Sequence, residues 1–336
     1  MATQASQPAG PTRGCQRLSL EQLHAWERLQ YGMFLHFGMS TYDGEELSTG
    51  EAPASTYAPD KLDVDQWVQT ARDAGMTYAV LTTKHVSGFC LWPTKHTDYN
   101  VTRSGNTTDV VADFVKACDR HGVKPGFYYC SWDNHHRFGS ETPSVTGEDL
   151  ELAFTTQRYR DFQLAQVEEL LTQYGPLVEM WIDIPGVLGA DGRRRQYEQI
   201  ASLQPDAMIM LNSGFGDGSQ VKYNYAWPSD LMAIERWLPS SHRGYNPWHC
   251  IGPCADAKQD YYLPGEVCDP IGYEWFHVDG DAPRSDAELL GMRLICRERK
   301  VNLLLNVPPD RSGRIPDVHV QALARLRDNM DRLNLN

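Results

Sequence analysis

The 336-residue sequence has little cysteine and little positive charge, and these two absences exclude several classes of protein. Its 8 cysteines are sparse and irregularly spaced, which does not suit the disulfide framework of a small secreted domain. The 31 lysines and arginines face 44 acidic residues, and the net charge is -13. Such a surface repels the phosphates of nucleic acids and of anionic membranes, so we expect neither as a partner.

The sequence also lacks a long hydrophobic run. No segment approaches the roughly 20 apolar residues that cross a bilayer. The first residues, MATQASQPAGPTRG, are polar and contain no apolar signal-peptide core, so we expect residues 1–17 to be a disordered lead-in. The cytoplasm is the expected location, although a secreted chain whose leader had been removed would look the same. The oligomeric state is left open by the sequence.

Motifs that bind phosphates or metals are missing as well. The segment GMFLHFGMSTY lacks the glycine spacing of a nucleotide-binding loop, and no HxH metal motif occurs. His249, Cys250 and Cys254 form the one cysteine-histidine cluster, but no second ligand pair follows at zinc spacing. The sequence therefore predicts no cofactor and no metal.

Apolar segments and amphipathic segments alternate along the chain. Strands are predicted at 32–38, 77–85, 124–131, 177–183, 206–213, 231–237, more weakly at 274–278, and at 301–307. Helices are predicted at 18–29, 63–75, 108–122, 149–174, 194–203 and 285–300, with capping boxes at Ser19 and Ser285. Apolar strands separated by helices indicate a parallel sheet that is buried on both faces. About eight such units favour a single (β/α)8 barrel domain at 18–336 over an open doubly wound sheet.

Polar and aromatic residues recur where these strands end. The C-terminal ends of parallel strands meet at one face of a barrel, so we expect these side chains to converge. They are His36, Lys84, His85, Tyr128, Trp132, Trp181, Asp183, Glu235, Arg236, Trp275 and His277. Aromatic rings that pack on apolar C–H faces, together with polar groups that fix hydroxyls, are suited to a sugar.

The segment LVEMWIDIPG, residues 177–186, places one carboxylate at such a strand end. Asp183 follows a mostly apolar run and precedes Pro185 and Gly186, which must stop the strand. Asp183 could merely cap the following turn. Together with a carboxylate from another strand, it could instead supply the nucleophile and the general acid/base of glycosidic cleavage.

Several blocks of the sequence resemble glycoside hydrolase family 29, the α-L-fucosidases. They are GMFLHFG, AGMTYAVLTTKHVSGFCLWPTKHTDYNV, KPGFYYCSWD, YGPLVEMWIDIPG and VNLLLNVPPDRSGRIP, in the family's order from about residue 18 to residue 333. The resemblance implies a retaining mechanism with Asp183 as the nucleophile. It also implies that a bound fucose lies among His36, His85, Trp92, Tyr128, Trp181 and Trp275.

The sequence departs from the family pattern at three places. One histidine, His85, follows Lys84 where the family commonly has two. The strand DAMIMLNS ends without the family's arginine, so Arg236 is a possible substitute. We also expect no C-terminal β-sandwich, so loops at 42–59 or 242–262 would have to complete the pocket wall.

Two glutamates are candidates for the acid/base. Glu235 is preferred, because an acid next to Trp237 and shielded by apolar neighbours would have the raised pKa of a proton donor. Glu266, in PGEVCDPIGYEW, is the alternative. Two other functions stay open: a fucose-binding barrel without catalysis, and a metal-dependent barrel hydrolase that uses His36, His85 and Asp183.

Overall fold

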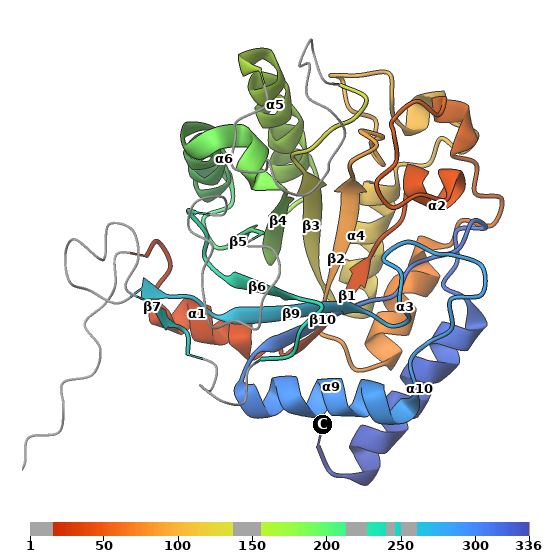
Figure 1. Ribbon diagram of the computed structural model, residues 1–336, viewed down its shortest axis with the longest axis vertical. Coiled ribbons are helices and arrows are strands. Elements are labelled where there is room, and N and C mark those ends of the chain that lie inside the picture. Colours follow the sequence, from red (N-terminus) through yellow and green to blue (C-terminus); the bar gives the residue numbers. More distant parts are fainter. Residues whose placement is uncertain (1–15, 137–155, 213–226, 240–245, 250–260, 336) are drawn as a thin grey trace, which may run out of the picture.

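The structure is a computed structural model and describes residues 16–136, 156–212, 227–239, 246–249 and 261–335. Its centre is an 8-stranded sheet in the order β5-β4-β3-β2-β1-β10-β9-β6, and every neighbouring pair is parallel. The sheet curls into a nearly closed barrel (Figure 1). The segment that precedes β6 bridges the last gap, since Asp230 N donates to Ile209 O at 2.8 Å and Leu211 N donates to Ser229 Oγ at 3.1 Å.

The barrel strands are β1 (Tyr31–Leu35), β2 (Tyr78–Lys84), β3 (Lys124–Cys130), β4 (Glu179–Asp183), β5 (Met208–Leu211), β6 (Met232–Glu235), β9 (Gly265–Pro270) and β10 (Asn302–Asn306). The main helices are α1 (Leu20–Glu27), α2 (Met39–Asp43), α3 (Val64–Asp73), α4 (Val110–His121), α5 (Gln157–Gln173), α6 (Gly189–Leu203), α9 (Asp286–Arg299) and α10 (Asp317–Arg332). A small antiparallel pair, β7 (Trp248–His249) with β8 (Tyr261–Tyr262), lies beside the barrel.

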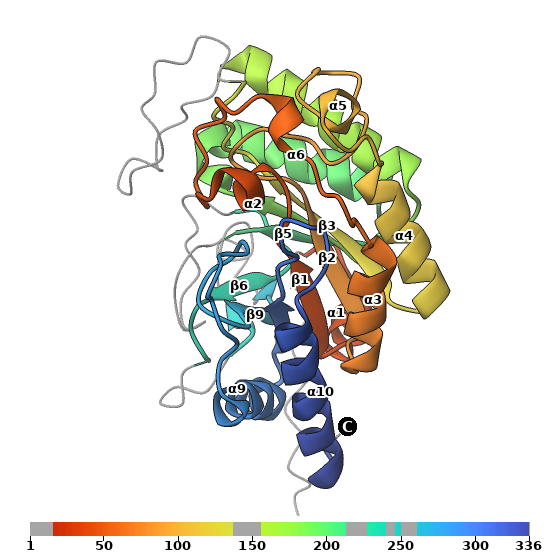
Figure 2. The same cartoon turned by 90° about the vertical axis from the view of Figure 1, so that its right-hand side faces the viewer.

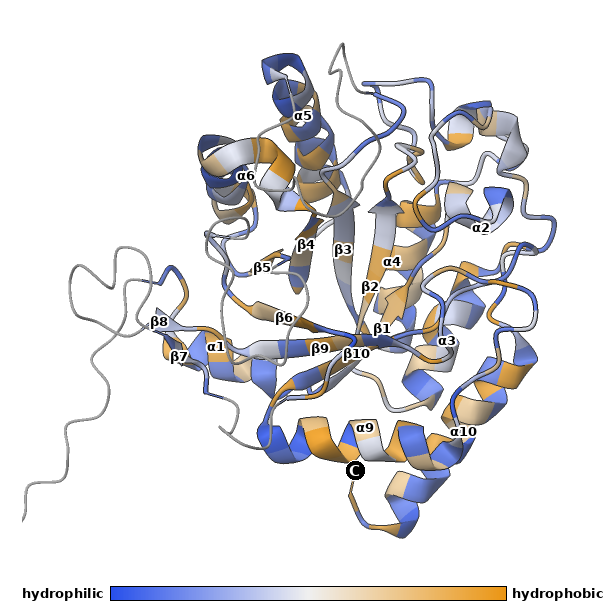
Figure 3. Cartoon of the chain, viewed as in Figure 1, coloured by the Kyte–Doolittle hydropathy of each residue, from blue (hydrophilic) through white to orange (hydrophobic). Residues whose placement is uncertain are grey.

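The apolar side chains form two layers. The outer layer lies between the strands and the helices, where Trp67 and Leu81 are fully buried. The inner layer fills the barrel itself and is rich in aromatic rings, including Phe34, Tyr78 and Trp181. Figure 2 shows α3, α4, α5 and α6 covering one side of the strands. Figure 3 shows hydrophobic and hydrophilic residues alternating along α9 and α10, as expected of helices with one buried face.

The structure confirms the predicted parallel barrel, and both predicted capping boxes are present. Ser19 accepts from Gln22 N, and Ser285 accepts from Glu288 N, at the starts of α1 and α9. The seventh strand was placed wrongly. Residues 274–278 form no strand, and the strand between β6 and β10 is β9, at 265–270. Its acidic residues and its terminal glycine and proline gave it the composition of a loop.

The expected lead-in at 1–17 is corrected at its end. Residues 1–15 lie outside the described residues, but Arg17 is held on the barrel. Its guanidinium contacts the Asp230 carboxylate at 2.5 Å and donates to Ala207 O at 2.5 Å. Within the described ranges, no helix is long and apolar enough to cross a membrane.

Candidate active site

Three strand ends place polar groups around Asp183. Asp183 ends β4, Tyr128 lies two residues before the end of β3, and Asn212 directly follows β5. Tyr128 donates its hydroxyl to Asp183 Oδ2 at 2.6 Å, and Asn212 donates its amide to Asp183 Oδ1 at 2.7 Å. Each oxygen of the carboxylate thus has a donor that fixes its orientation. Such a network holds a charged group at a strand end without an ion pair.

Asn212 also connects Asp183 to a second carboxyl group. Its Nδ2 lies 3.2 Å from Glu235 Oε2, while it lies 2.7 Å from Asp183 Oδ1. Glu235 is the last residue of β6, so the bridge spans the gap where the barrel closes. Sequence reasoning missed Asn212, although it carries the signal used elsewhere: a polar residue directly after an apolar strand.

The environment of Glu235 favours its neutral form. Burial, followed by the charge of Asp183, raises the pKa of Glu235 to about 7, whereas the Asn212 hydrogen bond pulls the pKa down. A carboxyl group whose pKa lies near 7 can both donate and accept a proton at physiological pH. Burial is the expected cause of this pKa, but Trp237 does not provide it, because its side chain is 57% exposed.

His36 and its neighbours form one wall of the site. His36 Nδ1 lies 2.8 Å from Asn306 Oδ1, and the amide orientation is fixed because Asn306 Nδ2 donates to Trp275 O at 2.8 Å. His36 therefore carries its proton on Nδ1 and leaves Nε2 as an acceptor. Burial lowers the pKa of His36 to about 3, so the ring is neutral. The Trp275 ring lies 5.0 Å from the imidazole.

His85 lies on the same side of the site. Its ring stacks on Tyr128 at a centroid distance of 5.6 Å and contacts Phe276 edge-on at 4.9 Å. Burial lowers the pKa of His85, and its Nδ1 is buried without a hydrogen-bond partner among the described residues. A neutral imidazole with an unused nitrogen is suited to a hydroxyl group of a ligand.

A third carboxyl group, Glu46, comes from the loop between α2 and α3. Burial raises its pKa, with a lowering effect from Arg236 and a raising effect from Asp183, which places Glu46 at the same mouth. Arg236 lies 5.1 Å from the Trp275 ring centre and donates to Tyr273 O at 2.8 Å. The loop at 42–59 was expected to reach the site, but Glu46 itself was not singled out.

A family model described as Alpha-L-fucosidase matches residues 48–333, which is most of the chain. The chain belongs to the α-L-fucosidase family. Alpha-L-fucosidase 1 of Arabidopsis thaliana is 32% identical over 319 residues, which cover 91% of this chain and 58% of that protein. Putative alpha-L-fucosidase 1 of rice is 30% identical, with 89% of this chain and 56% of that protein covered. The chain thus spans a little over half the length of these curated relatives.

Solved structures of the family share the fold. A putative alpha-L-fucosidase from Bacteroides thetaiotaomicron matches with a TM-score of 0.73 at 28% identity, over 95% of this chain and 69% of that one. AlfC from Lactobacillus casei, solved in complex with alpha-L-fucose product, matches with a TM-score of 0.69 at 21% identity, over 94% of this chain and 99% of that one. The first supports the family, and the second supports the fold alone.

One of the expected fucose contacts of the family lies elsewhere. Trp92 is fully buried in the outer apolar layer, and its indole N–H donates to Glu169 on α5 at 3.0 Å. A side chain between strands and helices cannot face a ligand at the barrel mouth, so the assignment of Trp92 is corrected. Lys84 also points outward, where its ammonium group pairs with Asp133 at 2.8 Å and both side chains are fully buried.

The alternative acid/base, Glu266, is corrected as well. It lies inside the barrel on β9 and is fully buried. Tyr78 donates to its Oε1 at 2.6 Å and Trp181 donates to its Oε2 at 2.9 Å. Burial raises the pKa of Glu266 to about 7, and it raises the pKa of its neighbour Glu179 as well. Glu266 therefore holds the Trp181 indole from inside the barrel and does not reach the C-terminal face where Asp183 lies.

Eight of the expected residues come together. His36, His85, Tyr128, Trp181, Asp183, Glu235, Arg236 and Trp275 share the C-terminal face of the barrel. Cys250 and Cys254 lie outside the described residues. In the part of the chain that the structure describes, no group of three His, Cys, Asp or Glu side chains is placed to hold a metal ion.

Proposed function

We propose that this protein is a retaining exo-α-L-fucosidase, which removes terminal α-L-fucosyl residues through a covalent fucosyl-enzyme. The observation that carries the proposal is the Asn212 amide between Asp183 and Glu235. Two oxygens that share one amide nitrogen at these distances lie within about 6 Å of each other. Retaining glycosidases hold their carboxyl groups roughly 5–5.5 Å apart, whereas inverting ones need roughly 6.5–9.5 Å to admit a water molecule.

In the first step, an oxygen of Asp183 attacks the anomeric carbon of fucose. The bond between that carbon and the glycosidic oxygen breaks, and Glu235 gives its proton to the departing oxygen. With a pKa of about 7, Glu235 is protonated in a large fraction of the molecules at neutral pH. The products of this step are the free aglycone, a fucosyl ester on Asp183 and an ionised Glu235.

In the second step, water releases the sugar. The Glu235 carboxylate takes a proton from a water molecule, whose oxygen attacks the anomeric carbon and displaces Asp183 as a carboxylate. Glu235 thereby regains its proton and the enzyme returns to its starting state. Tyr128 and Asn212 hold the two Asp183 oxygens throughout, so that the nucleophile needs no reorientation between the steps.

The walls of the site suit a deoxy sugar. Trp181, Tyr128 and Phe34 form an aromatic floor, with ring centres 5.2 Å apart for Phe34 and Trp181 and 6.2 Å apart for Tyr128 and Trp181. Such rings pack on C–H groups, including the methyl group of fucose. The neutral imidazoles of His36 and His85 offer hydrogen bonds to hydroxyl groups. The substrate is thus a fucosylated oligosaccharide or glycoconjugate.

Azide rescue tests the proposal. The substrate is an aryl α-L-fucoside, whose activated aryl group leaves with little help from an acid. Glu235→Ala should form the fucosyl-enzyme but hydrolyse it slowly, and azide should restore turnover by giving fucosyl azide, since azide needs no general base. The matched control is Glu198→Ala, which removes an exposed carboxyl group on α6.

The control variant should hydrolyse the substrate like the wild type and should not respond to azide. No rescue of Glu235→Ala, with its fold intact by circular dichroism, would refute the acid/base assignment. Two rival functions have distinct outcomes. Fucose binding without any hydrolysis by the wild type would favour a binding protein, and loss of hydrolysis with a chelator would favour a metal-dependent hydrolase.

A further inference from the structure

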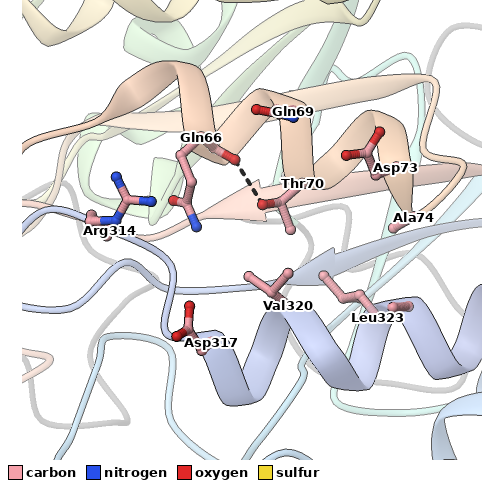
Figure 4. Close-up of a pocket in the computed structure, with 10 residues that line it drawn as sticks. Gln66, Gln69, Thr70, Asp73, Ala74, Arg314, Asp317, Val320 and Leu323 are labelled. Carbon is pink, nitrogen blue, oxygen red and sulfur yellow. Dashed lines mark hydrogen bonds between the residues drawn. The ribbon is translucent and has the colours of Figure 1, made fainter.

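Two cavities lie beside α10, one between α10 and α3 and the other between α10, α9 and the end of α1. The larger one has a volume of about 390 Å³ and is lined by Gln66, Asp73, Arg314 and Asp317, among others (Figure 4). Its charges are balanced, because Arg314 forms an ion pair with Asp63 and two carboxylates share the lining. The lining of this cavity therefore gives no indication of a charged ligand.

The smaller cavity has a different character. Its volume is about 170 Å³, and three arginines line it: Arg28 from the end of α1, Arg293 from α9 and Arg327 from α10. Its other lining residues are Leu29, Gln30, Tyr31, Ala74, Gly75, Thr77, Leu326 and Met330, so no acidic residue is among them. Three arginines therefore line the cavity and no acidic residue does, in a chain whose net charge is -13.

Arg293 is the key residue of this cavity. It is only 8% exposed, and its Nη1 is buried without a hydrogen-bond partner among the described residues. Its guanidinium carbon lies 4.9 Å from the Tyr31 ring centre. Burial lowers the pKa of Arg293, and the groups with the strongest effect on it, Tyr31, Cys296, Arg297 and Tyr78, include no carboxylate. A buried cation without a counter-charge is strongly unfavourable unless something pairs with it.

Two further groups complete the donor set. The Tyr31 hydroxyl is buried without a partner among the described residues, and burial raises its pKa, so it keeps its proton as a donor. Arg327 packs against the turn at Gly75, where an added Cβ would meet its Nη1 at 2.1 Å. Gly75 has a φ of +80° and thus leaves room for the guanidinium. Among the described residues, Arg327 forms one ion pair, from Nε to Asp331 at 3.4 Å.

We propose that this cavity binds a small tetrahedral oxyanion, phosphate or sulfate, between Arg28, Arg293 and Arg327, with the Tyr31 hydroxyl as a further donor. The planar fork of a guanidinium matches two oxygens of such an anion. A cavity holds one water molecule in roughly 10–15 Å³, so about 170 Å³ accommodates the anion together with a few water molecules. The anion would supply the negative charge that the lining lacks.

The site is separate from the proposed catalytic centre. Tyr31 begins β1 and Thr77 precedes β2, so the cavity lies at the N-terminal end of the barrel. Asp183 and Glu235 end their strands at the opposite face. An anion bound here stabilises the folded state, because the unfolded chain does not hold the three arginines together.

Binding is tested with inorganic phosphate as the probe. The heat of phosphate binding is measured by isothermal titration calorimetry, and the unfolding midpoint is measured across a phosphate series against sodium chloride of equal ionic strength. The wild type should bind saturably and unfold at a higher temperature in phosphate than in matched chloride. Acetate should have a much weaker effect, since a monocarboxylate can engage fewer of the guanidinium groups.

Variants locate the site. Arg293→Met keeps most of the apolar stem and removes the charge, while Arg327→Gln removes a second charge without touching the buried group. Each should weaken phosphate binding at least tenfold and leave fucoside hydrolysis unchanged. The matched control is Arg325→Gln on the same helix, whose arginine pairs with Asp286 away from the cavity. The Arg325→Gln variant should bind phosphate like the wild type. If Arg293→Met does not fold, Arg327→Gln still tests the site.

The result that overturns the proposal is phosphate binding of equal strength in the wild type and both cavity variants, or an effect that matched chloride reproduces. A sugar sulfate is added to identify the source of the anion. Tighter binding of the sugar sulfate than of inorganic sulfate, lost in Arg327→Gln, supports the site with a sulfated glycan as its ligand. Equal or weaker binding of the sugar sulfate supports a free ion.

Discussion

Asn212 is the residue whose replacement has the most specific expected outcome. Asn212→Ala removes the amide that contacts Asp183 at 2.7 Å and Glu235 at 3.2 Å. A hydrogen bond to a charged group contributes about 1.5–3 kcal/mol, which corresponds to roughly 10- to 150-fold in rate. We therefore expect kcat/KM for an aryl fucoside to fall by about this factor, with the fold retained.

The same substitution should change the pH profile in a direction that a general loss of packing does not explain. With an alkyl α-L-fucoside, whose leaving group needs protonation, Glu235 must be protonated to donate, so kcat/KM falls as the pH rises through its pKa of about 7. Asn212 lowers this pKa, so removing it should move the alkaline limb to higher pH. An Asn329→Ala variant on α10 is the control. An unmoved limb, or one at lower pH, would refute the reasoning.

Three further predictions follow from contacts around the site and in the barrel wall. Tyr128→Phe removes the 2.6 Å hydrogen bond to Asp183, so kcat should fall about tenfold or more while the unfolding midpoint changes little. Glu266→Gln concerns stability against pH. Because the pKa of Glu266 is raised, its contribution to the free energy of unfolding is fully present below pH 4.5, its usual pKa, and is lost as the pH rises through about 7. Unfolding free energies measured in urea should therefore fall less steeply over that pH range in the variant than in the wild type. Equal slopes would contradict this. Lys84→Met removes the ammonium partner of the buried Asp133, which keeps its contact with His136, and should destabilise the protein by up to about 3–5 kcal/mol, measured by denaturant unfolding.

The barrel was predictable from the sequence because most strands are continuous apolar runs between helices with clear caps. The strand β9 was not, because one of its inward side chains is a carboxyl group, Glu266, within the aromatic interior. Glu266 accepts from Tyr78 and Trp181 there, and such a contact between distant strands leaves no local signal. The length of α6 was also underestimated, since its first turn contains two glycines, Gly189 and Gly192.

The site was predictable where a single residue follows a strand, as with His36 and Asp183. It was not predictable where the role depends on a partner. Trp92 lies in a block that resembles the family, yet its indole points at Glu169 in the outer layer. The role of Asn212 depends on two partners, because its amide reaches two carboxyl groups on strands that are distant in the sequence.

The measurement that tests the central claim most directly is the configuration of the first fucose released. Proton NMR during hydrolysis of an aryl α-L-fucoside, faster than mutarotation, distinguishes the two anomers. Attack by Asp183 followed by attack of water inverts the anomeric carbon twice, so the account predicts that α-L-fucose appears first. Initial release of β-L-fucose would show a single displacement by water and would contradict the role of Asp183 as nucleophile.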